Sequence, residues 1–344
     1  MQTHDLSVGG DVLERVTRCA QRAVSGYGCH PDAVVGLLNV SENATYLVED
    51  PDQGPSILRV HRLGYHTVPE IESELAWMDA LRAEAGVRTP RILPALDGRR
   101  ITTTTDPSTG EQRYCVRFEY LPGSEPVQYA IDHFAELGEI TARMHKHARR
   151  WVGPRWFTRF HWDYEAAFGD RARWGRWQDG VSVGVQERDV LGRLDTTLRA
   201  RLGRFGTGPE RYGLIHADTR LANLIVTDTA GGAEADSEIG NVSVIDFDDC
   251  GFSWYLYDVG TSVSFFEHQP QVPDLVDSWL SGYRRVLELP AEDEAEIWTF
   301  IMFRRLLLVA WIGSHTAVDI AQQLGAGYTR DSCDLAELYL RRVG

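Results

Sequence analysis

The stretch that decides the fold is LIHADTRLANLIV, residues 214–226, in which two apolar runs enclose a short polar turn. The pattern predicts two short strands joined by a tight loop that brings Asp218, Arg220 and Asn223 together. An acid five residues before an amide suits phosphoryl transfer, because the carboxylate can accept a proton from an attacking hydroxyl while the amide oxygen holds a metal ion. The alternative is a structural turn in which Asp218 and Asn223 cap backbone groups.

A second stretch, VSVIDFDD at 242–249, reads as a strand that ends in three carboxylates, Asp246, Asp248 and Asp249. Like charges this close repel one another and cost stability unless cations lie among them. Carboxylate oxygens are the ligands through which proteins hold Mg²⁺, together with the phosphates of a substrate. The two stretches together favour a metal-dependent phosphate site over the alternative, a solvated acidic turn.

The composition is that of a folded globular protein, with 43% hydrophobic and 25% charged residues among 344. The net charge of −15 repels phosphate backbones and anionic lipid, so we expect neither a nucleic acid nor a membrane as partner and favour a cationic or small neutral one. The five cysteines include no C-x-x-C pair, which argues against a disulfide framework and a zinc site. The most apolar run, 306–312, is far shorter than the ~20 residues of a membrane span. No basic stretch followed by an apolar one opens the chain, and we expect a cytoplasmic protein.

The chain divides into a strand-rich first part and a helical second part. Three short β-branched runs at 36–40, 45–49 and 56–61 predict an antiparallel meander, and one helix at 68–86 separates them from three further strands. The strands are expected at 36–40, 45–49, 56–61, 91–96, 99–105 and 113–121. Helices are expected at 127–146, 183–202, 275–287 and 297–312, short strands at 213–216, 223–226 and 242–247, and a surface loop at 227–241. The sequence therefore predicts an α+β protein of two lobes, a small β-rich lobe at 1–121 and a larger, mainly helical lobe at 122–344.

Two motifs resemble those of a known family, the protein-kinase-like small-molecule phosphotransferases, which include aminoglycoside phosphotransferases and choline kinases. HADTRLAN is similar to the family's catalytic loop, and VIDFDDCGFSWYLYDVG to its metal-binding strand and the helix that follows. The resemblance implies a two-lobed protein-kinase-like fold and transfer of the γ-phosphate of ATP, with Mg²⁺, to a hydroxyl of a small molecule. It makes Asp218 the catalytic carboxylate and Asn223 and Asp246 the magnesium ligands, with Asp248 supporting a second ion.

Three neighbours of these residues carry further expectations. Arg220 follows the acid by two residues and is placed to stabilise charge on the transferring phosphate, the alternative being a surface ion pair with a nearby carboxylate. The resemblance implies that Asp258 anchors backbone amides of the catalytic loop. Ala217 stands where the family usually has glycine, a small change that a loop without positive φ at this position accepts.

The resemblance also covers the first part of the chain. ILRVHRLGYHT is similar to the strand with the family's phosphate-clamping lysine, here Arg59, and arginine can pair with phosphate and with a helix glutamate. We choose Glu74 in EIESELAWMDAL as that partner, with Glu70 as the fallback. The alternative is that Arg59 is a charge on the strand surface.

Two short segments complete the expected nucleotide site. SENATYLV is similar to the family's nucleotide-positioning hairpin, in which Ser41 and Asn43 bond phosphate or, alternatively, only hold the turn. The connector FEYLP is expected to meet adenine with the carbonyl of Glu119 and the amide of Leu121.

Tryptophans and arginines alternate in residues 151–177. Such a pattern can stack nucleic-acid bases, but the net charge argues against that, and we predict a helical insertion that packs over the acceptor side, partly as core and partly as substrate contacts.

The favoured function is an ATP- and Mg²⁺-dependent phosphotransferase with a small alcohol as acceptor: an aminoglycoside, another antibiotic, an amino alcohol or a homoserine-like molecule. Two alternatives stay open, a protein Ser/Thr kinase of the stress-response type and a non-catalytic nucleotide-binding regulator.

Overall fold

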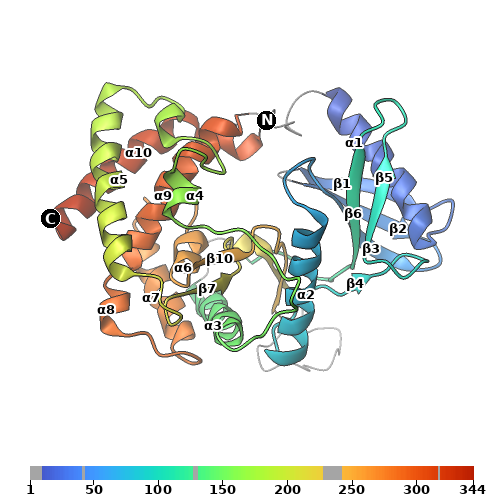
Figure 1. Cartoon of the computed structure of the whole chain (residues 1–344), viewed down its shortest axis with the longest axis horizontal. Coiled ribbons are helices and arrows are strands. Elements are labelled where there is room, and N and C mark those ends of the chain that lie inside the picture. The colour runs from blue at the N-terminus through green and yellow to red at the C-terminus, as the bar shows by residue number, and fades with distance from the viewer. Residues whose placement is uncertain (1–9, 41–42, 127–130, 228–241, 317) are drawn as a thin grey trace. The chain divides into compact units, whose positions relative to one another are not determined.

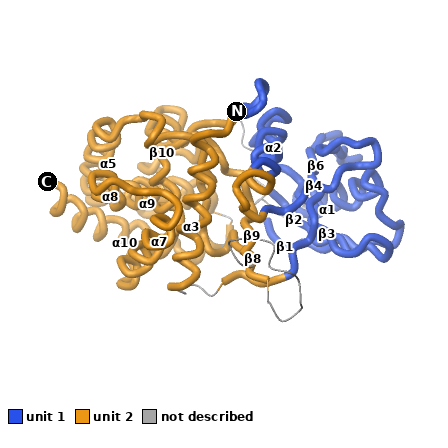
Figure 2. Tube along the Cα trace, turned by 90° about the horizontal axis from the view of Figure 1, so that it is seen from below, with its two compact units in different colours: residues 1–80, 89–122, 153–158 blue, residues 81–88, 123–152, 159–344 orange. Residues whose placement is uncertain are grey.

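The structure is a computed structural model that describes residues 10–40, 43–126, 131–227, 242–316 and 318–344. They form two compact units (Figure 2), one of residues 1–80, 89–122 and 153–158 and the other of residues 81–88, 123–152 and 159–344. The two predicted lobes and their boundary stay a prediction. The compact units are defined by contacts within the chain, whereas the lobes are defined by what each of them binds. The expected loop at 227–241 lies outside the described residues except for its first.

The first unit is built on an antiparallel sheet of strand order β1-β2-β3-β6-β4, in which β5 also pairs with β6 (Figure 1). The strands are β1 Val34–Val40, β2 Ala44–Asp50, β3 Gly54–Val60, β4 Ile92–Leu93, β5 Ile101–Thr105 and β6 Gln112–Glu119. Each overlaps a predicted run, and β1, β2 and β3 pair in chain order, which confirms the meander predicted for the first three runs. Burial alternates along β2, as expected of a strand with one face on a core.

Helix α1, Gly10–Ala23, packs on this sheet (Figure 1). Its Val16 and Ala20 share one buried cluster with Tyr46 and Leu58 of the strands. The sequence predictions omit this helix, although its apolar residues recur at helical spacing. A short 3-10 turn, η1 Val24–Tyr27, follows it.

Helix α2, Val68–Glu84, begins at a capping box. The backbone N–H of Thr67 donates to Glu70 Oε2 at 2.7 Å, and the N–H of Glu70 donates to Thr67 Oγ1 at 3.4 Å. The helix ends two residues before the predicted position, and Gly86 follows with φ +65°, in the left-handed region that suits glycine at a helix end. The side chain of Glu70 is therefore engaged at the helix start.

The second unit is mainly helical. Its helices are α3 Ile131–Ala148, α4 Tyr164–Phe168, α5 Val185–Phe205, α6 Tyr257–Ser262, α7 Val272–Tyr283, α8 Ala291–Glu294, α9 Ile297–Ser314 and α10 Asp319–Val343, with 3-10 turns η2 Trp177–Asp179 and η3 Leu221–Asn223. Two antiparallel pairs of strands accompany them, β7 Tyr212–Ile215 with β10 Gly251–Trp254 and β8 Leu224–Val226 with β9 Val242–Val244. Helices α3, α5, α7 and α9 match predicted segments, whereas α10 and β10 were not predicted.

Helix α9 forms the centre of the second unit, where it packs against α5, α6 and α10. Within the described ranges, one stretch, Ala291–Ser314, is long and apolar enough to cross a membrane, and 83% of its most apolar window is buried inside the protein. A helix that is apolar all round suits either a membrane or a protein core. The burial identifies α9 as a core helix.

The segment 151–177 is largely irregular, so the predicted helical insertion is wrong. Its one α-helix among the described residues is the five-residue α4, and glycines and a proline interrupt the remainder. Trp162, Trp174 and Trp177 are buried, which confirms that part of the segment is core, whereas Trp156 is half exposed.

Candidate active site

The two polar loops flank one pair of strands: the loop with Asp218 and Asn223 precedes β8, and the loop with Asp246 follows β9. Strands β8 and β9 pair so that Leu224 faces Val244, and the N–H of Ile245 donates to the carbonyl of Asn223 at 2.9 Å. This register brings the backbone of Asn223 beside the residue that precedes Asp246. The expected closeness of the two predicted magnesium ligands follows from this pairing, and their role as ligands stays a prediction.

Asp258 holds the backbone of the catalytic loop, as the resemblance implies. Its Oδ1 accepts from the N–H of Ala217 at 2.8 Å, and its Oδ2 accepts from the N–H of His216 at 3.3 Å. His145 Nε2 lies 2.9 Å from Asp258 Oδ2, and its Nδ1 lies 3.0 Å from the Tyr283 hydroxyl. Burial lowers the pKa of His145, so the neutral ring donates through Nε2 and accepts through Nδ1.

Ala217 has a φ of +66°, so the loop does not meet the condition under which alanine replaces glycine without strain. Its side chain is fully buried and its N–H is fixed by Asp258. The anchored loop therefore imposes a left-handed conformation that costs a residue with a Cβ about 1–2 kcal/mol.

The Asp218 carboxylate is surrounded by donors. Its Oδ1 accepts from Arg304 Nη2 at 2.9 Å and its Oδ2 from Asn223 Nδ2 at 2.8 Å. The Nε of Arg220 is shared between the two oxygens at 3.2 and 3.1 Å. Burial raises the pKa of Asp218, but the guanidinium groups of Arg220 and Arg304 outweigh it and lower the pKa below its usual value. The group is therefore an anion at neutral pH.

Arg220 thus forms an ion pair with Asp218 itself, which is the alternative expected for it, with the predicted catalytic acid as the partner. Its guanidinium also lies 5.6 Å from the ring centroid of Phe265. The predicted action of Arg220 on the phosphate stays a prediction.

The orientation of the Asn223 amide is fixed by what it contacts. Its nitrogen donates to the backbone carbonyl of Asp218 and to Asp218 Oδ2, both at 2.8 Å. Since both partners only accept, the nitrogen must face them and the amide oxygen must face away. That oxygen fits the ligand role assigned to Asn223.

The predicted carboxylates after β9 differ from each other. Asp246 is exposed with φ +61°, and Asp248 is 5% exposed. The described residues hold no cluster of three His, Cys, Asp or Glu side chains placed to bind a metal ion. A magnesium site here would therefore combine the Asn223 oxygen with one or two carboxylates and substrate phosphate, which is how proteins hold this ion.

Arg304 was missed by the sequence predictions. It lies on α9, 86 residues from Asp218, and its side chain is 3% exposed. The sequence signal was a pair of arginines inside an apolar helix, which requires buried acceptors for their charge. The pattern does not say which carboxylate supplies them, because only the packing of α9 brings the partner close.

The predicted pairing of Arg59 with Glu74 is confirmed. Arg59 Nη2 lies 2.5 Å from Glu74 Oε1, and both residues are buried. The guanidinium of Arg59 lies 5.1 Å from the ring centroid of Phe118. Because Arg59 is buried, the alternative of a charge on the strand surface is excluded. Glu70 instead caps α2. The role of the pair toward nucleotide phosphates stays a prediction.

Two of the other predicted nucleotide residues, Asn43 and Glu119, have structural partners. Asn43 is buried, and its Oδ1 accepts from the N–H of Arg62 at 3.1 Å, so it holds the chain at the end of β3. Ser41 lies outside the described residues. Glu119 ends β6, and its Oε1 accepts from the N–H of Arg91 at 2.8 Å. The adenine-binding roles of the Glu119 carbonyl and the Leu121 amide stay predictions.

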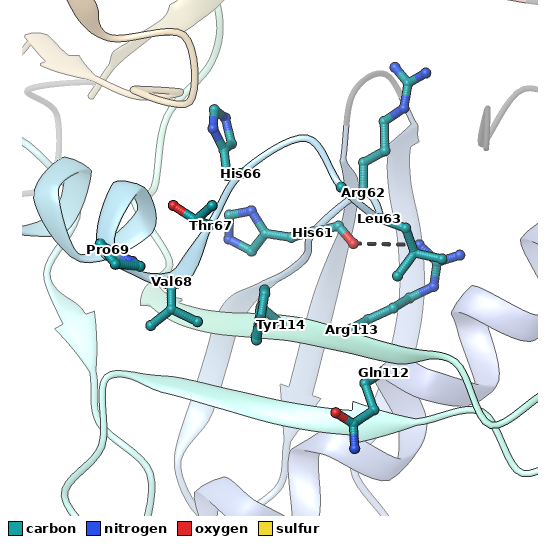
Figure 3. Close-up of a pocket in the computed structure, with 11 residues that line it drawn as sticks. His61, Arg62, Leu63, His66, Thr67, Val68, Pro69, Gln112, Arg113 and Tyr114 are labelled. Atoms are coloured by element: carbon teal, nitrogen blue, oxygen red, sulfur yellow. Dashed lines mark hydrogen bonds between the residues drawn. The ribbon is translucent and has the colours of Figure 1, made fainter. Parts of the chain in front are cut away.

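A pocket of about 470 Å³ opens in the first unit between the segment after β3 and the start of β6 (Figure 3). It is lined by His61, Arg62, Leu63, Gly64, His66, Thr67, Val68, Pro69, Gln112, Arg113 and Tyr114. Figure 3 shows Arg113 donating to the carbonyl of His61, at 3.5 Å. The pocket includes the histidine and arginine that follow Arg59 along the chain, but neither Arg59 nor Glu74 lines it.

Comparisons with known proteins identify the family of this chain. The family model described as "Phosphotransferase enzyme family" matches residues 34–296. A solved microcompartment-associated aminopropanol kinase is 49% identical, with a TM-score of 0.85, over 94% of this chain and 97% of that one. Amicoumacin kinase of Bacillus subtilis is 24% identical over 325 residues, 90% of this chain and 89% of the relative.

A further solved structure supports the fold alone. An amicoumacin kinase in complex with AMP-PNP and Ca²⁺ is 20% identical with a TM-score of 0.74, and covers 98% of this chain and 97% of that one. The expected α+β, protein-kinase-like fold is therefore confirmed. The relatives carry phosphate to small molecules, which favours the leading interpretation over a protein kinase or a non-catalytic regulator. The chain belongs to the phosphotransferase enzyme family, and it is a small-molecule kinase that transfers phosphate to a hydroxyl group.

Proposed function

We propose that this protein phosphorylates the hydroxyl group of a short amino alcohol, with aminopropanol as the first candidate. The observation that carries this proposal is the 49% identity to an aminopropanol kinase over 94% of the chain. The net charge of −15 supports a cationic acceptor, since such a surface attracts an ammonium group.

Asp218 is the base of the proposed reaction. Its carboxylate is ionised, and it accepts the proton of the acceptor hydroxyl as that oxygen forms a bond to the γ-phosphorus of ATP and the bond to the β-phosphate oxygen breaks. Asn223 and Asp246 hold Mg²⁺, with Asp248 beside it, and the bound ion supplies positive charge to the phosphates. Arg59, held by Glu74, pairs with the nucleotide phosphates, while Asn43, Ser41, Glu119 and Leu121 complete the nucleotide site. Positioning and charge account for most of the catalysis in such transfers.

The test is a coupled assay of ADP release with aminopropanol, ethanolamine, choline, homoserine and aminoglycosides as acceptors. We expect the highest kcat/KM with aminopropanol or ethanolamine. A preference for an aminoglycoside by tenfold or more contradicts the proposed acceptor class.

The Asp218→Ala variant tests the base in the same assay. We expect turnover to fall by at least a hundredfold, because a positioned general base contributes about 10²–10⁴-fold. Asp195→Ala is the matched control. The Asp195 carboxylate accepts from Trp177 Nε1 and the Tyr164 hydroxyl, whereas the Asp218 carboxylate accepts from Asn223. An Asp218 variant as fast as the parent removes Asp218 from the mechanism.

The proposed site of action is the cytoplasm, where ATP is available. All five cysteines are free thiols, and three of them are buried, which suits a reducing compartment.

A further inference from the structure

The two arginines that contact Asp218 differ in how firmly they are held. The Arg304 side chain is 3% exposed, whereas that of Arg220 is 29% exposed. Besides Asp218, Arg304 donates to Ser264 Oγ at 3.1 Å and to the Tyr257 hydroxyl at 3.0 Å. Its guanidinium lies 5.2 Å from the ring centroid of Trp174. Arg304 cannot turn away without breaking these contacts inside the core.

The bonds to Asp218 also differ in strength. Arg304 and Asn223 each donate to one oxygen, at 2.9 and 2.8 Å. Arg220 places one N–H between both oxygens at 3.2 and 3.1 Å, and a bond shared in this way is weaker than two direct ones. An ionised carboxylate has about four acceptor sites. The sites nearest to Arg220 are therefore the ones that a substrate hydroxyl can take at the lowest cost.

We propose that Arg304 is a positioning residue of the transfer reaction: it keeps the Asp218 carboxylate in place while the acceptor hydroxyl replaces the shared bond from Arg220. The inference rests on the proposed function, because it takes Asp218 as the base. It also reconciles the two expectations for Arg220, since an arginine displaced from Asp218 is free to face the phosphate.

The placement of Arg304 supports this role over a purely structural one. A buried ion pair is weak evidence for stability, because removing two charges from water costs as much as their attraction returns. Among the described residues, Asp218 is the only carboxylate bonded to Arg304. The buried guanidinium therefore orients the carboxylate of Asp218. Arg305 offers a comparison on the same helix: it is also buried and bonds Glu267, Ser332 and Tyr328 instead.

The experiment compares Arg304→Ala and Arg304→Lys with Arg305→Lys, using whichever acceptor the screen identifies. We expect Arg304→Ala to lower kcat on the order of a hundredfold, the cost of misplacing a reacting group by about 1 Å. Its KM for the acceptor and its calorimetric Kd for ATP should stay within about twofold of the parent values. Added ethylguanidinium should restore kcat at least fivefold, and Arg304→Lys should lie between Ala and the parent. Arg305→Lys should lower the melting temperature and leave kcat unchanged.

Two results overturn the inference alone. One is a kcat of Arg304→Ala equal to that of the parent. The other is a fall in kcat of Arg305→Lys as large as that of Arg304→Ala, with no rescue of Arg304→Ala by ethylguanidinium. If Arg304→Ala does not fold, a parental kcat of Arg304→Lys overturns it. An active parent with an equally active Asp218→Ala variant instead refutes the proposed base, and the inference falls with it. The inference is supported if Arg304→Ala has a lowered kcat that ethylguanidinium restores, while Arg305→Lys keeps the kcat of the parent.

Discussion

At the scale of the residue, Ala217 adopts a backbone conformation that is unfavourable for a residue with a Cβ atom. The backbone is held at φ +66° because Asp258 fixes the adjacent amides. The strain is retained because the same bonds orient the loop that presents Asp218, a pattern common at functional sites.

Replacing Ala217 by glycine should therefore stabilise the protein. We expect Ala217→Gly to increase the free energy of unfolding by about 1 kcal/mol, since glycine adopts positive φ without a steric penalty. Chemical denaturation measures this change. Ala222→Gly is the matched control in the same loop: Ala222 lies in η3, without positive φ, so glycine should destabilise it. An equal loss of stability in both variants would show that the strain at Ala217 is negligible.

At the scale of the element, polar side chains decide where the strands of the first unit turn. Asp50 ends β2, and its Oδ1 accepts from the N–H groups of Asp52 and Gln53 at 2.8 and 3.0 Å. Its Oδ2 accepts from the N–H of His30 at 2.9 Å. Burial raises the pKa of Asp50, but these backbone bonds outweigh it and lower the pKa to about 2.

The stability contributed by Asp50 should depend on pH. Because its folded pKa is lowered, the contribution is present above the ordinary value near 4 and is lost as the pH falls toward about 2. We expect Asp50→Asn to be less stable than the parent at pH 7, with the difference shrinking between about pH 4 and pH 2.5. Thermal melting across this range measures it. Asp52→Asn removes the same charge from an exposed side chain and should show no such convergence; a parallel trend in both variants refutes the role of Asp50.

Helices illustrate the same scale. Helix α2 was predictable in type and extent because the spacing of its apolar residues and the glycine that follows it are local signals. Helix α1 carries the same kind of local signal, the helical spacing of its apolar residues, but the sequence predictions omit it. The segment 151–177 shows the opposite error: a helical insertion was predicted, whereas an irregular chain places its buried tryptophans in the core.

At the scale of the whole molecule, the net charge of −15 acts on any charged acceptor before it binds. Such a field raises the local concentration of cations, and salt screens it over a Debye length of about 10 Å at 0.1 M.

If the acceptor is cationic, salt should weaken its binding. We expect the KM for aminopropanol to rise as the ionic strength increases from about 0.02 to 0.2 M at saturating ATP, with kcat unchanged. The inhibition constant of propanediol, a neutral analogue, should stay constant over the same range. If the KM of aminopropanol and the inhibition constant of propanediol change equally with salt, the net charge plays no part in the choice of acceptor.

The sequence by itself determined what depends on neighbours along the chain: the strand meander, the turn that joins Asp218 to Asn223, the extent of α2 and the choice of Glu74 for Arg59. These features follow from periodicity, turn chemistry and short spacings, which are written locally. Only the tertiary structure decided that Arg304 holds Asp218 and that Asp258 forces Ala217 into positive φ. These contacts join residues 86 and 41 positions apart, and the hydrophobic packing of α9 and α6 that creates them has no signature in the spacing of the polar residues it brings together.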